Sequence, residues 1–360
     1  ITMTPSNMDY ASEPVHFGLP IRPVVNEPKL SGSAKTPSVL EDGGSTGETL
    51  ILPNSNLYGT ITDGDGNPIP GVAVSDGYSY CSTDINGVYQ MSANTQARTV
   101  NVTIPAAYEI PLGSDGRPAF FQPIDLTEGK KAEKDFTLIA RPSIPSRFTI
   151  IGVADAHVKD AVVNGTSENI NVRFTTAMED VQETVTALGT EIPVGPGGES
   201  AGEIIGIALG DQLWDEFSST TYNNIKSKFN TLTNKAGKTV PFFYCIGNHD
   251  HDNNGTSDYT SENAFVNNFG PTNYSFDMGN AHIIVMDNVI YTGSGSGTIS
   301  YNTGFTQAQI EWLNADIAKV TGKSNKIVVL CVHVALSKSS GGDAGTQNAV
   351  MGALKNNFKN

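Results

Sequence analysis

Six side chains that can bind metal ions follow short apolar runs of this sequence. They are Asp155, His157, Asp211, Asn248, His249 and His333. Each apolar run, such as 204–209 before Asp211, is typical of a strand that is buried on both faces. In open α/β sheets, sites collect at the carboxyl ends of the strands, so we expect these side chains to form one metal centre. Their mixture of nitrogen and oxygen ligands favours Mn, Fe, Zn or Co over calcium.

A centre of this kind could hydrolyse a phosphoric ester with water as the nucleophile. Two metal ions about 3.5–4 Å apart can clamp a phosphoryl group and produce hydroxide at neutral pH. Asp211 follows a glycine that allows a sharp turn, and its two carboxylate oxygens could bridge both ions. His249 could protonate the leaving oxygen, because its neighbour Asn248 would bind a metal. Asp250 could orient the His249 ring.

The elements that must position these side chains alternate between strand and helix patterns after residue 147. Apolar residues recur at helical spacing along 222–232. Thr306 and Gln309 form a capping-box pattern in front of a second apolar stripe. This alternation predicts an α/β layered domain.

The region before residue 144 has a different composition. Residues 1–56 are rich in Ser, Pro, Gly, Thr and acids, and we expect them to be extended or partly disordered. Residues 57–143 contain short alternating runs and turn signals such as 64–68, which predict a small all-β domain. The predicted organisation is therefore 1–56, 57–143 and 144–360.

Composition and charge exclude several functions. The 360 residues include 22 Lys and Arg against 37 Asp and Glu, which gives a formal net charge of −15. This balance argues against general nucleic-acid binding, because phosphate contacts need a basic face. No apolar run reaches the roughly 18 residues that a membrane helix needs. Cys245 and Cys331 lie within apolar runs, so we expect buried apolar side chains rather than a disulfide framework.

The motifs closely resemble those of the calcineurin-like metallophosphoesterase family, which are D-x-H, G-D-x-x-D, G-N-H-D or G-N-H-E, a later His, and G-H-x-H. Residues 155–157 match the first motif, 247–250 the third and His333 the fourth. Residues 273–287 resemble the strand pair that follows the third motif in that family. The resemblance covers about 147–360 and implies a double β-sheet sandwich flanked by helices.

The same resemblance implies a dinuclear centre of Mn, Fe, Zn or Co that hydrolyses small phosphoric mono- or diesters. It assigns five metal ligands: Asp155, His157, Asp211, Asn248 and His333. Asp155 and His157 would hold one ion, Asn248 and His333 the other, and Asp211 would bridge them. His249 would be catalytic.

Three features depart from the family pattern or extend it. The second motif reads Gly210-Asp211-Gln212-Leu213-Trp214-Asp215, so its second Asp stands one position late. His251 follows the third motif and could replace a missing ligand, although a solvated loop position is the simpler interpretation. No G-H-x-H follows His333, so we expect a truncated form of a longer protein. The rival hypothesis is a non-catalytic cell-surface or carbohydrate-associated binding protein that reuses the fold.

Residues 57–143 resemble the carboxypeptidase regulatory-like β-sandwich family. The stretches 59–63, 66–72 and 83–89 carry this resemblance. That family implies an accessory domain that is common in secreted proteins, and it implies no chemistry. With both regions together, the chain is similar to multidomain bacterial secreted phosphoesterases, so we expect a secreted, periplasmic or cell-surface protein.

Overall fold

The structure, a computed structural model, describes residues 51–162, 169–188, 202–336 and 344–358. The segment that we expect to be extended, residues 1–56, therefore lies almost entirely outside the described residues.

Residues 51–141 form eight short strands and one short 3₁₀ helix, Thr127–Gly129. The strands are β1 (Leu57–Asp63), β2 (Ala73–Ser75), β3 (Tyr80–Ser82), β4 (Val88–Met91), β5 (Thr99–Val102), β6 (Phe121–Pro123), β7 (Ala132–Glu133) and β8 (Phe136–Leu138). One sheet has the order β4-β1-β7, with β8 also paired to β1, and the other has the order β3-β2-β5-β6. Buried residues alternate along β1, because one face of the strand packs on a core that includes Leu57, Ile61 and Val100.

Two further sheets carry the predicted site. The first has the order β11-β10-β9 and is parallel, and its strands are β9 (Phe148–Val153), β10 (Glu203–Leu209) and β11 (Phe242–Cys245). The second has the order β12-β13-β16, and its strands are β12 (Tyr274–Met278), β13 (Ala281–Val285) and β16 (Ile327–Cys331). A hairpin of β14 (Val289–Tyr291) and β15 (Tyr301–Thr303) lies between β13 and β16 in sequence. The four apolar runs before the candidate ligands are thus β9, β10, β11 and β16.

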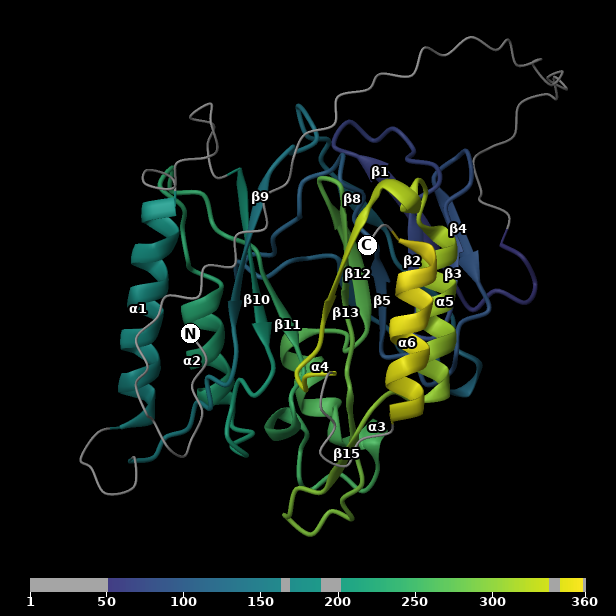
Figure 1. Cartoon of the computed structure of the whole chain (residues 1–360). Coiled ribbons are helices and arrows are strands. Elements are labelled where there is room, and N and C mark those ends of the chain that lie inside the picture. The colour runs from purple at the N-terminus through teal and green to yellow at the C-terminus, as the bar shows by residue number, and fades with distance from the viewer. Residues whose placement is uncertain (1–50, 163–168, 189–201, 337–343, 359–360) are drawn as a thin grey trace, which may run out of the picture. The chain divides into compact units, whose positions relative to one another are not determined.

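Helices pack against both of these sheets, which makes the architecture a mixed α/β one (Figure 1). The described helices are α1 (Ile170–Leu188), α2 (Ser219–Phe229), α3 (Asp258–Ser261), α4 (Asn263–Phe269), α5 (Gln307–Lys319) and α6 (Ala344–Asn357). Side chains of α1 and α2 share a core with Phe242 of β11, and side chains of α5 and α6 share another with Ile284 of β13. The predicted capping box is confirmed, because the Thr306 side chain accepts a hydrogen bond from the Gln309 N–H at the start of α5. None of the described helices is long and apolar enough to cross a membrane.

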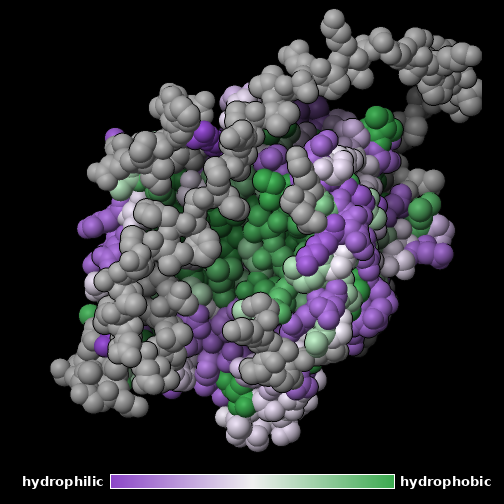
Figure 2. Space-filling model, viewed as in Figure 1, coloured by the Kyte–Doolittle hydropathy of each residue, from purple (hydrophilic) through white to green (hydrophobic). Residues whose placement is uncertain are grey.

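β9 and β16 are less buried than the sequence predicts. Their residues are mostly half-buried, whereas those of β10 and β11 are mostly buried. Within the described ranges, β9 pairs only with β10 and β16 only with β13, so each strand has one open edge. Figure 2 shows apolar side chains gathered in the middle of the face that is turned toward the viewer. The expectation of burial on both faces is therefore correct for β10 and β11 and wrong for β9 and β16. The strand edge alone does not explain the difference, because among the described strands β11 also pairs with one strand only; its two faces are covered by aromatic rings, as Phe229 packs on Phe242 and Phe276 stacks on Phe243.

The first eight strands pack against the sheets that follow. Phe120 shares a third core with Ile205 of β10 and with Phe243 of β11. The Trp312 indole N–H of α5 donates to the Ser75 hydroxyl at 3.1 Å. The guanidinium of Arg98 is paired with the carboxylate of Glu262. The β-rich segment and the site-bearing sheets therefore contact each other through apolar, polar and charged side chains.

The buried His282 of β13 should make the stability of the protein depend on pH. The His282 ring lies 2.8 Å from Asp277 at Nδ1 and 2.8 Å from Asp316 at Nε2. Burial lowers the pKa of His282, but the hydrogen bonds and charges of the two carboxylates outweigh it and raise the pKa from 6.5 to about 9. Since the folded protein holds this proton more tightly, the stabilisation is complete below pH 6.5 and is lost as the pH rises through about 9.

We expect the free energy of unfolding to fall by up to about 3 kcal/mol across this pH range. Urea denaturation at pH 6, 7.5 and 9 would measure it, with His282→Asn as the comparison. The variant is expected to be less stable at pH 6 and to lack most of the decline. Parallel pH profiles for the two proteins would contradict the assignment.

Candidate metal centre

The predicted ligands lie where β9, β10, β11 and β16 end. Asp155 and His157 follow β9, and Asp211 follows the neighbouring β10. The backbone N–H of Asp155 donates to the Gly210 carbonyl at 3.1 Å, and that of His157 donates to the Asp211 carbonyl at 2.9 Å. The loops after β9 and β10 are therefore joined to each other beyond the ends of the strands.

The other two loops reach the same place. Asn248 and His249 lie in a single 3₁₀ turn directly after β11. His333 follows β16, and its Nδ1 lies 3.0 Å from the carbonyl oxygen of Leu209 at the end of β10. The Nε2 of His333 lies 3.2 Å from the Asn248 side-chain oxygen. Segments that are more than 80 residues apart in sequence thus meet at one point, as Asn248 and His333 show.

The side chains form two groups that could each hold a metal ion. One group is His157, Asp211 and His249, and the other is Asp155, Asp211 and His333, with the ligand atoms of each group within 4.8 Å of one another. Asp211 belongs to both groups, which is what a bridging carboxylate requires. Asp155 is grouped with His333, and its carboxylate also lies 4.0 Å from Nε2 of His157, so our pairing of Asp155 with His157 stays a prediction. The nitrogen and oxygen donors fit Mn, Fe, Zn or Co.

The backbone is strained at this centre. Among the described residues, the non-glycine residues with positive φ are Asp155 (55°), His157 (48°), Asp211 (52°) and Asp215 (51°). This left-handed conformation costs on the order of 1–3 kcal/mol for each such residue and is found preferentially at functional sites. All four residues lie in the loops of the centre, so the strain itself indicates a functional role for this part of the fold.

Two glycines allow the loops to approach one another. A Cβ added to Gly247 would lie 2.2 Å from the Asp211 backbone nitrogen. A Cβ added to Gly210, whose φ is +92°, would lie 2.4 Å from Nδ1 of His333. Because neither position has room for a side chain, the glycines of the second and third motifs serve close packing around Asp211.

Asp211 is the electrostatic centre of the site. Its Oδ2 lies 3.0 Å from Nε2 of His157 and 3.4 Å from Nε2 of His333, and its Oδ1 accepts the His249 backbone N–H at 2.8 Å. Burial raises the pKa of Asp211, but the hydrogen bonds to His157 and His333 outweigh it and hold the pKa well below its usual range. Burial lowers the pKa of His333, but Asp211 outweighs it and raises the pKa to about 9. Asp211 is thus an ionised carboxylate, which is the form that binds a metal.

Asp215, not Asp250, holds the ring of His249. The Asp215 Oδ1 lies 2.8 Å from Nδ1 of His249. Burial lowers the pKa of His249, but the hydrogen bond to Asp215 and the nearby carboxylates outweigh it and raise the pKa. The left-handed backbone at Asp215 provides a sharp turn just before this contact, although the residue stands one position late in its motif. In the sequence, only the spacing of Asp215 after Asp211 pointed to a role for this residue at the centre.

Asp250 has a different role from the one that we expected. Its side chain is fully buried and accepts backbone N–H groups from Gln212 at 2.9 Å, Leu213 at 3.2 Å and Gly247 at 2.9 Å. These bonds occupy both carboxylate oxygens. Asp250 therefore ties the loop after β11 to the loop after β10 and supports the ligands indirectly.

Trp214 and His251 complete the surroundings of the centre. The half-buried Trp214 ring packs against the rings of His157 and His249, with centroid distances of 4.7 and 5.2 Å. His251 is fully buried and belongs to neither ligand group, so the expectation of a solvated loop position is wrong. Its ring is held instead by Ser261, whose hydroxyl oxygen lies 2.8 Å from Nδ1.

Comparison with known proteins finds a family model that matches the first part of the chain. Residues 55–141 match the family model described as the N terminal of Calcineurin-like phosphoesterase. This match supports the calcineurin-like phosphoesterase family, whose members generally use divalent metals, in agreement with the two ligand groups around Asp211. It does not bear on the carboxypeptidase regulatory-like resemblance of the same residues, which stays a prediction. No curated protein matches the chain.

Proposed function

We propose that this protein hydrolyses phosphoric mono- or diesters at a dinuclear metal centre, with water as the nucleophile. The observation that carries the proposal is that Asp211 belongs to two ligand groups at the converging ends of the strands. The match of residues 55–141 to the N terminal of Calcineurin-like phosphoesterase supports the same reaction class. The ligand set has the mixed imidazole and carboxylate chemistry that Mn, Fe, Zn and Co accept.

We assign most residues of the centre to binding cations and one, His249, to proton transfer. Asp155, His157, Asp211 and His333, with the side-chain oxygen of Asn248, would hold the ions. When bound, two divalent cations supply charge that polarises a phosphoryl group and makes water nucleophilic at neutral pH. Asp211 would keep the two ligand groups in register, because its Oδ2 lies 3.0 Å from Nε2 of His157 in one group and 3.4 Å from Nε2 of His333 in the other.

His249 would act as the general acid for the leaving group. The Asp215 carboxylate would accept a hydrogen bond from Nδ1–H of the ring. The opposite nitrogen, Nε2, would then deliver its proton to the leaving oxygen. The Asp215 carboxylate also favours the imidazolium, so the ring would be charged when the ester arrives. The ring packs against Trp214, which restricts its orientation.

The proposed architecture follows from the same assignment. The sheets of β9–β11 and of β12, β13 and β16 share one apolar core, which supports a double β-sheet sandwich flanked by helices. Residues 57–143 would form an accessory β-sandwich, and residues 144–360 the phosphoesterase region. A small phosphorylated substrate is part of this proposal, and the secreted, periplasmic or cell-surface location stays a prediction.

The test is metal-dependent hydrolysis of model esters by the purified chain. The protein would be loaded with manganese and assayed with p-nitrophenyl phosphate and bis(p-nitrophenyl) phosphate. We expect hydrolysis of at least one ester, loss of hydrolysis with EDTA, and recovery when manganese is returned. A protein that holds its metal ions but hydrolyses neither ester would overturn the proposal and favour the rival hypothesis of a binding protein.

A further inference from the structure

Asn288 links the segment that follows β13 to the loop that carries His333. Its side chain is fully buried, and its amide nitrogen donates to the Val334 carbonyl at 2.6 Å. Its amide oxygen accepts the Val334 backbone N–H at 3.0 Å. One side chain therefore binds both polar backbone groups of Val334, the residue that directly follows His333.

This link lies where the backbone pairing of the two strands has ended. β13 and β16 are paired as far as Val285 and Cys331, and the Met286 N–H then donates to the Cys331 carbonyl at 3.1 Å. Beyond this bond, residues 332–336 form no helix or strand and are half-buried or exposed. A loop of this kind is easily displaced unless side chains hold its backbone. The Asn288 amide extends the connection between the two strands by one more pair of hydrogen bonds.

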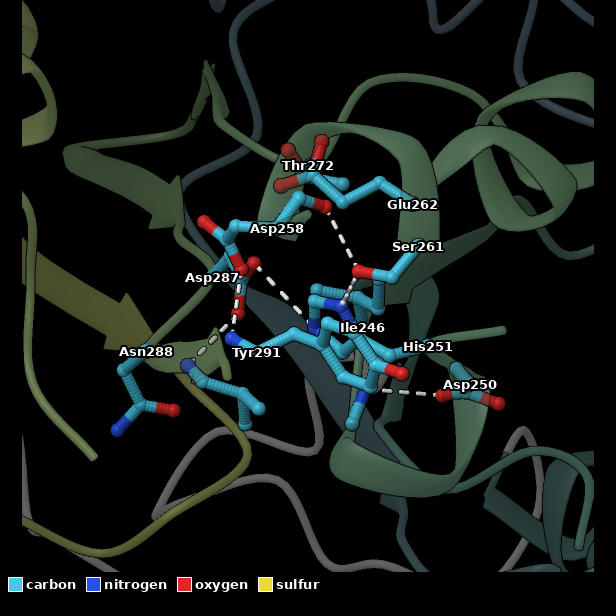
Figure 3. Close-up of polar contacts among 12 residues, drawn as sticks. Ile246, Asp250, His251, Asp258, Ser261, Glu262, Thr272, Asp287, Asn288 and Tyr291 are labelled. Carbon is cyan, nitrogen blue, oxygen red and sulfur yellow. Dashed lines mark hydrogen bonds and ion pairs between the residues drawn. The ribbon is translucent and has the colours of Figure 1, made fainter. Parts of the chain in front are cut away.

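Asn288 and its neighbour Asp287 are themselves held by surrounding elements. The Asp287 carbonyl accepts the side-chain N–H of Gln309 in α5 at 2.7 Å. The Asn288 carbonyl accepts the Gly304 N–H, directly after β15, at 3.0 Å. The Asp287 carboxylate lies 3.6 Å from Nε2 of the buried His251, and Figure 3 shows it turned toward that ring. Asn288 is thus a fixed point from which the loop after β16 can be positioned.

The ring of His333 is the part of this loop that reaches the metal centre. Its Nδ1 lies 3.0 Å from the Leu209 carbonyl oxygen, which favours a proton on Nδ1 of the neutral ring and leaves Nε2 to bind a cation. His333 forms one ligand group with Asp155 and Asp211, and the other ligand group does not contain it. Metal ligands must be held within about 0.5 Å of the productive geometry. A shift of this loop would therefore disturb one ligand group directly and spare the other.

We propose that Asn288 is a positioning residue for His333 and thereby sets the cation affinity of the group formed by Asp155, Asp211 and His333. The Asn288 amide fixes the backbone of Val334, which fixes where the neighbouring imidazole lies. This inference rests on the proposed function, because it takes the two ligand groups as cation sites. It goes further, since it predicts that one side chain outside the centre controls one site and not the other.

The test measures manganese binding to the metal-free chain by calorimetry, for wild type and two variants. Asn288→Ala removes both hydrogen bonds to Val334. Asn288→Ser keeps a polar group in the same buried space, in case the alanine variant does not fold. We expect two binding steps in wild type. In both variants one step should weaken by about 10–100-fold, as is usual when a residue that orients a metal ligand is removed, and the other should be unchanged.

Asn56→Ala is the matched control, because Asn56 holds a backbone segment in the same way in the β-rich part of the chain. It directly precedes β1. Its amide nitrogen donates to the Ala93 carbonyl at 3.0 Å, and its amide oxygen accepts the Ala93 N–H at 2.7 Å. We expect this variant to bind manganese as wild type does, although it loses an equivalent pair of hydrogen bonds. Urea denaturation of every variant would show whether the losses of stability are comparable.

A double-mutant cycle with His333→Ala tests whether Asn288 acts through this ligand. If it does, Asn288→Ala will weaken manganese binding in the wild-type background and will have no further effect in the His333→Ala background. Equal losses in the two backgrounds would overturn the inference. So would wild-type affinity in both Asn288 variants, or the same loss of affinity in Asn56→Ala.

Ester hydrolysis, measured on the same samples, separates this inference from the proposed function. Two manganese sites, one of them controlled by Asn288 through His333, without any hydrolysis would keep the inference and reject the proposed function. Metal-dependent hydrolysis by wild type, with unchanged manganese binding in the Asn288 variants, would keep the function and reject the inference. A wild-type chain that binds no manganese would overturn both.

Discussion

Replacement of Asp211 by asparagine is expected to remove both metal ions from this protein and to lower ester hydrolysis by about 10³-fold or more. Asp211 is the side chain that the two ligand groups share. An amide has one oxygen and no charge, so it cannot serve two cations as a carboxylate does. The change would also release His157 and His333, whose Nε2 atoms lie 3.0 and 3.4 Å from the Asp211 carboxylate.

The measurement is the metal-to-protein ratio after manganese loading and desalting. We expect about two ions for each wild-type chain and close to none for Asp211→Asn. Asp160→Asn is the matched control, because Asp160 is an exposed carboxylate that follows the same β9 loop and belongs to neither ligand group. A variant that retains two ions would exclude Asp211 as the bridging ligand. Loss of metal from the control as well would point to unfolding of the loop.

The second large effect is expected at His249, whose replacement by alanine should lower kcat by about 10²–10⁴-fold. His249 is a member of one ligand group, but its Nδ1 is engaged by Asp215. His157 and Asp211 remain in that group, and the Asp155 carboxylate lies 4.0 Å from Nε2 of His157. We therefore expect the metal content to change little while turnover is nearly lost. Wild-type rates for His249→Ala would rule out its role as the general acid.

Asp215→Asn is the companion variant that tests how His249 is held. The His249 ring is unchanged in this variant, but the Asp215 carboxylate that raises the pKa of His249 is replaced by an amide. We expect a loss of about 10–100-fold, which is smaller than the loss for His249→Ala. Since the imidazolium would lose its stabilising partner, the alkaline limb of the pH–rate profile should move to lower pH. An unchanged profile would mean that Asp215 does not set the protonation of His249.

Much of the candidate centre could be located from local sequence. The ligands follow apolar runs that form β9, β10, β11 and β16, because such runs form strands and glycine or polar residues end them. The capping box at Thr306 likewise determined where α5 begins, since its hydrogen bonds lie within one turn. Cys245 and Cys331 are buried as predicted, with exposures of 0% and 6%. All of these features depend on residues that are close together in the chain.

Only the tertiary structure decided which side chains meet. Asp155 and His333 are far apart in sequence but fall in one ligand group, because the end of β16 lies against the end of β10. His249 is held by Asp215 and not by its neighbour Asp250, whose carboxylate is occupied by backbone N–H groups of two loops. Sequence determines where polar side chains follow the strands. Which partners these side chains have depends on how the loops from separate strands turn toward one another. Those turns need residues with positive φ and glycines in close contact with neighbouring loops, and both arise only in the folded chain.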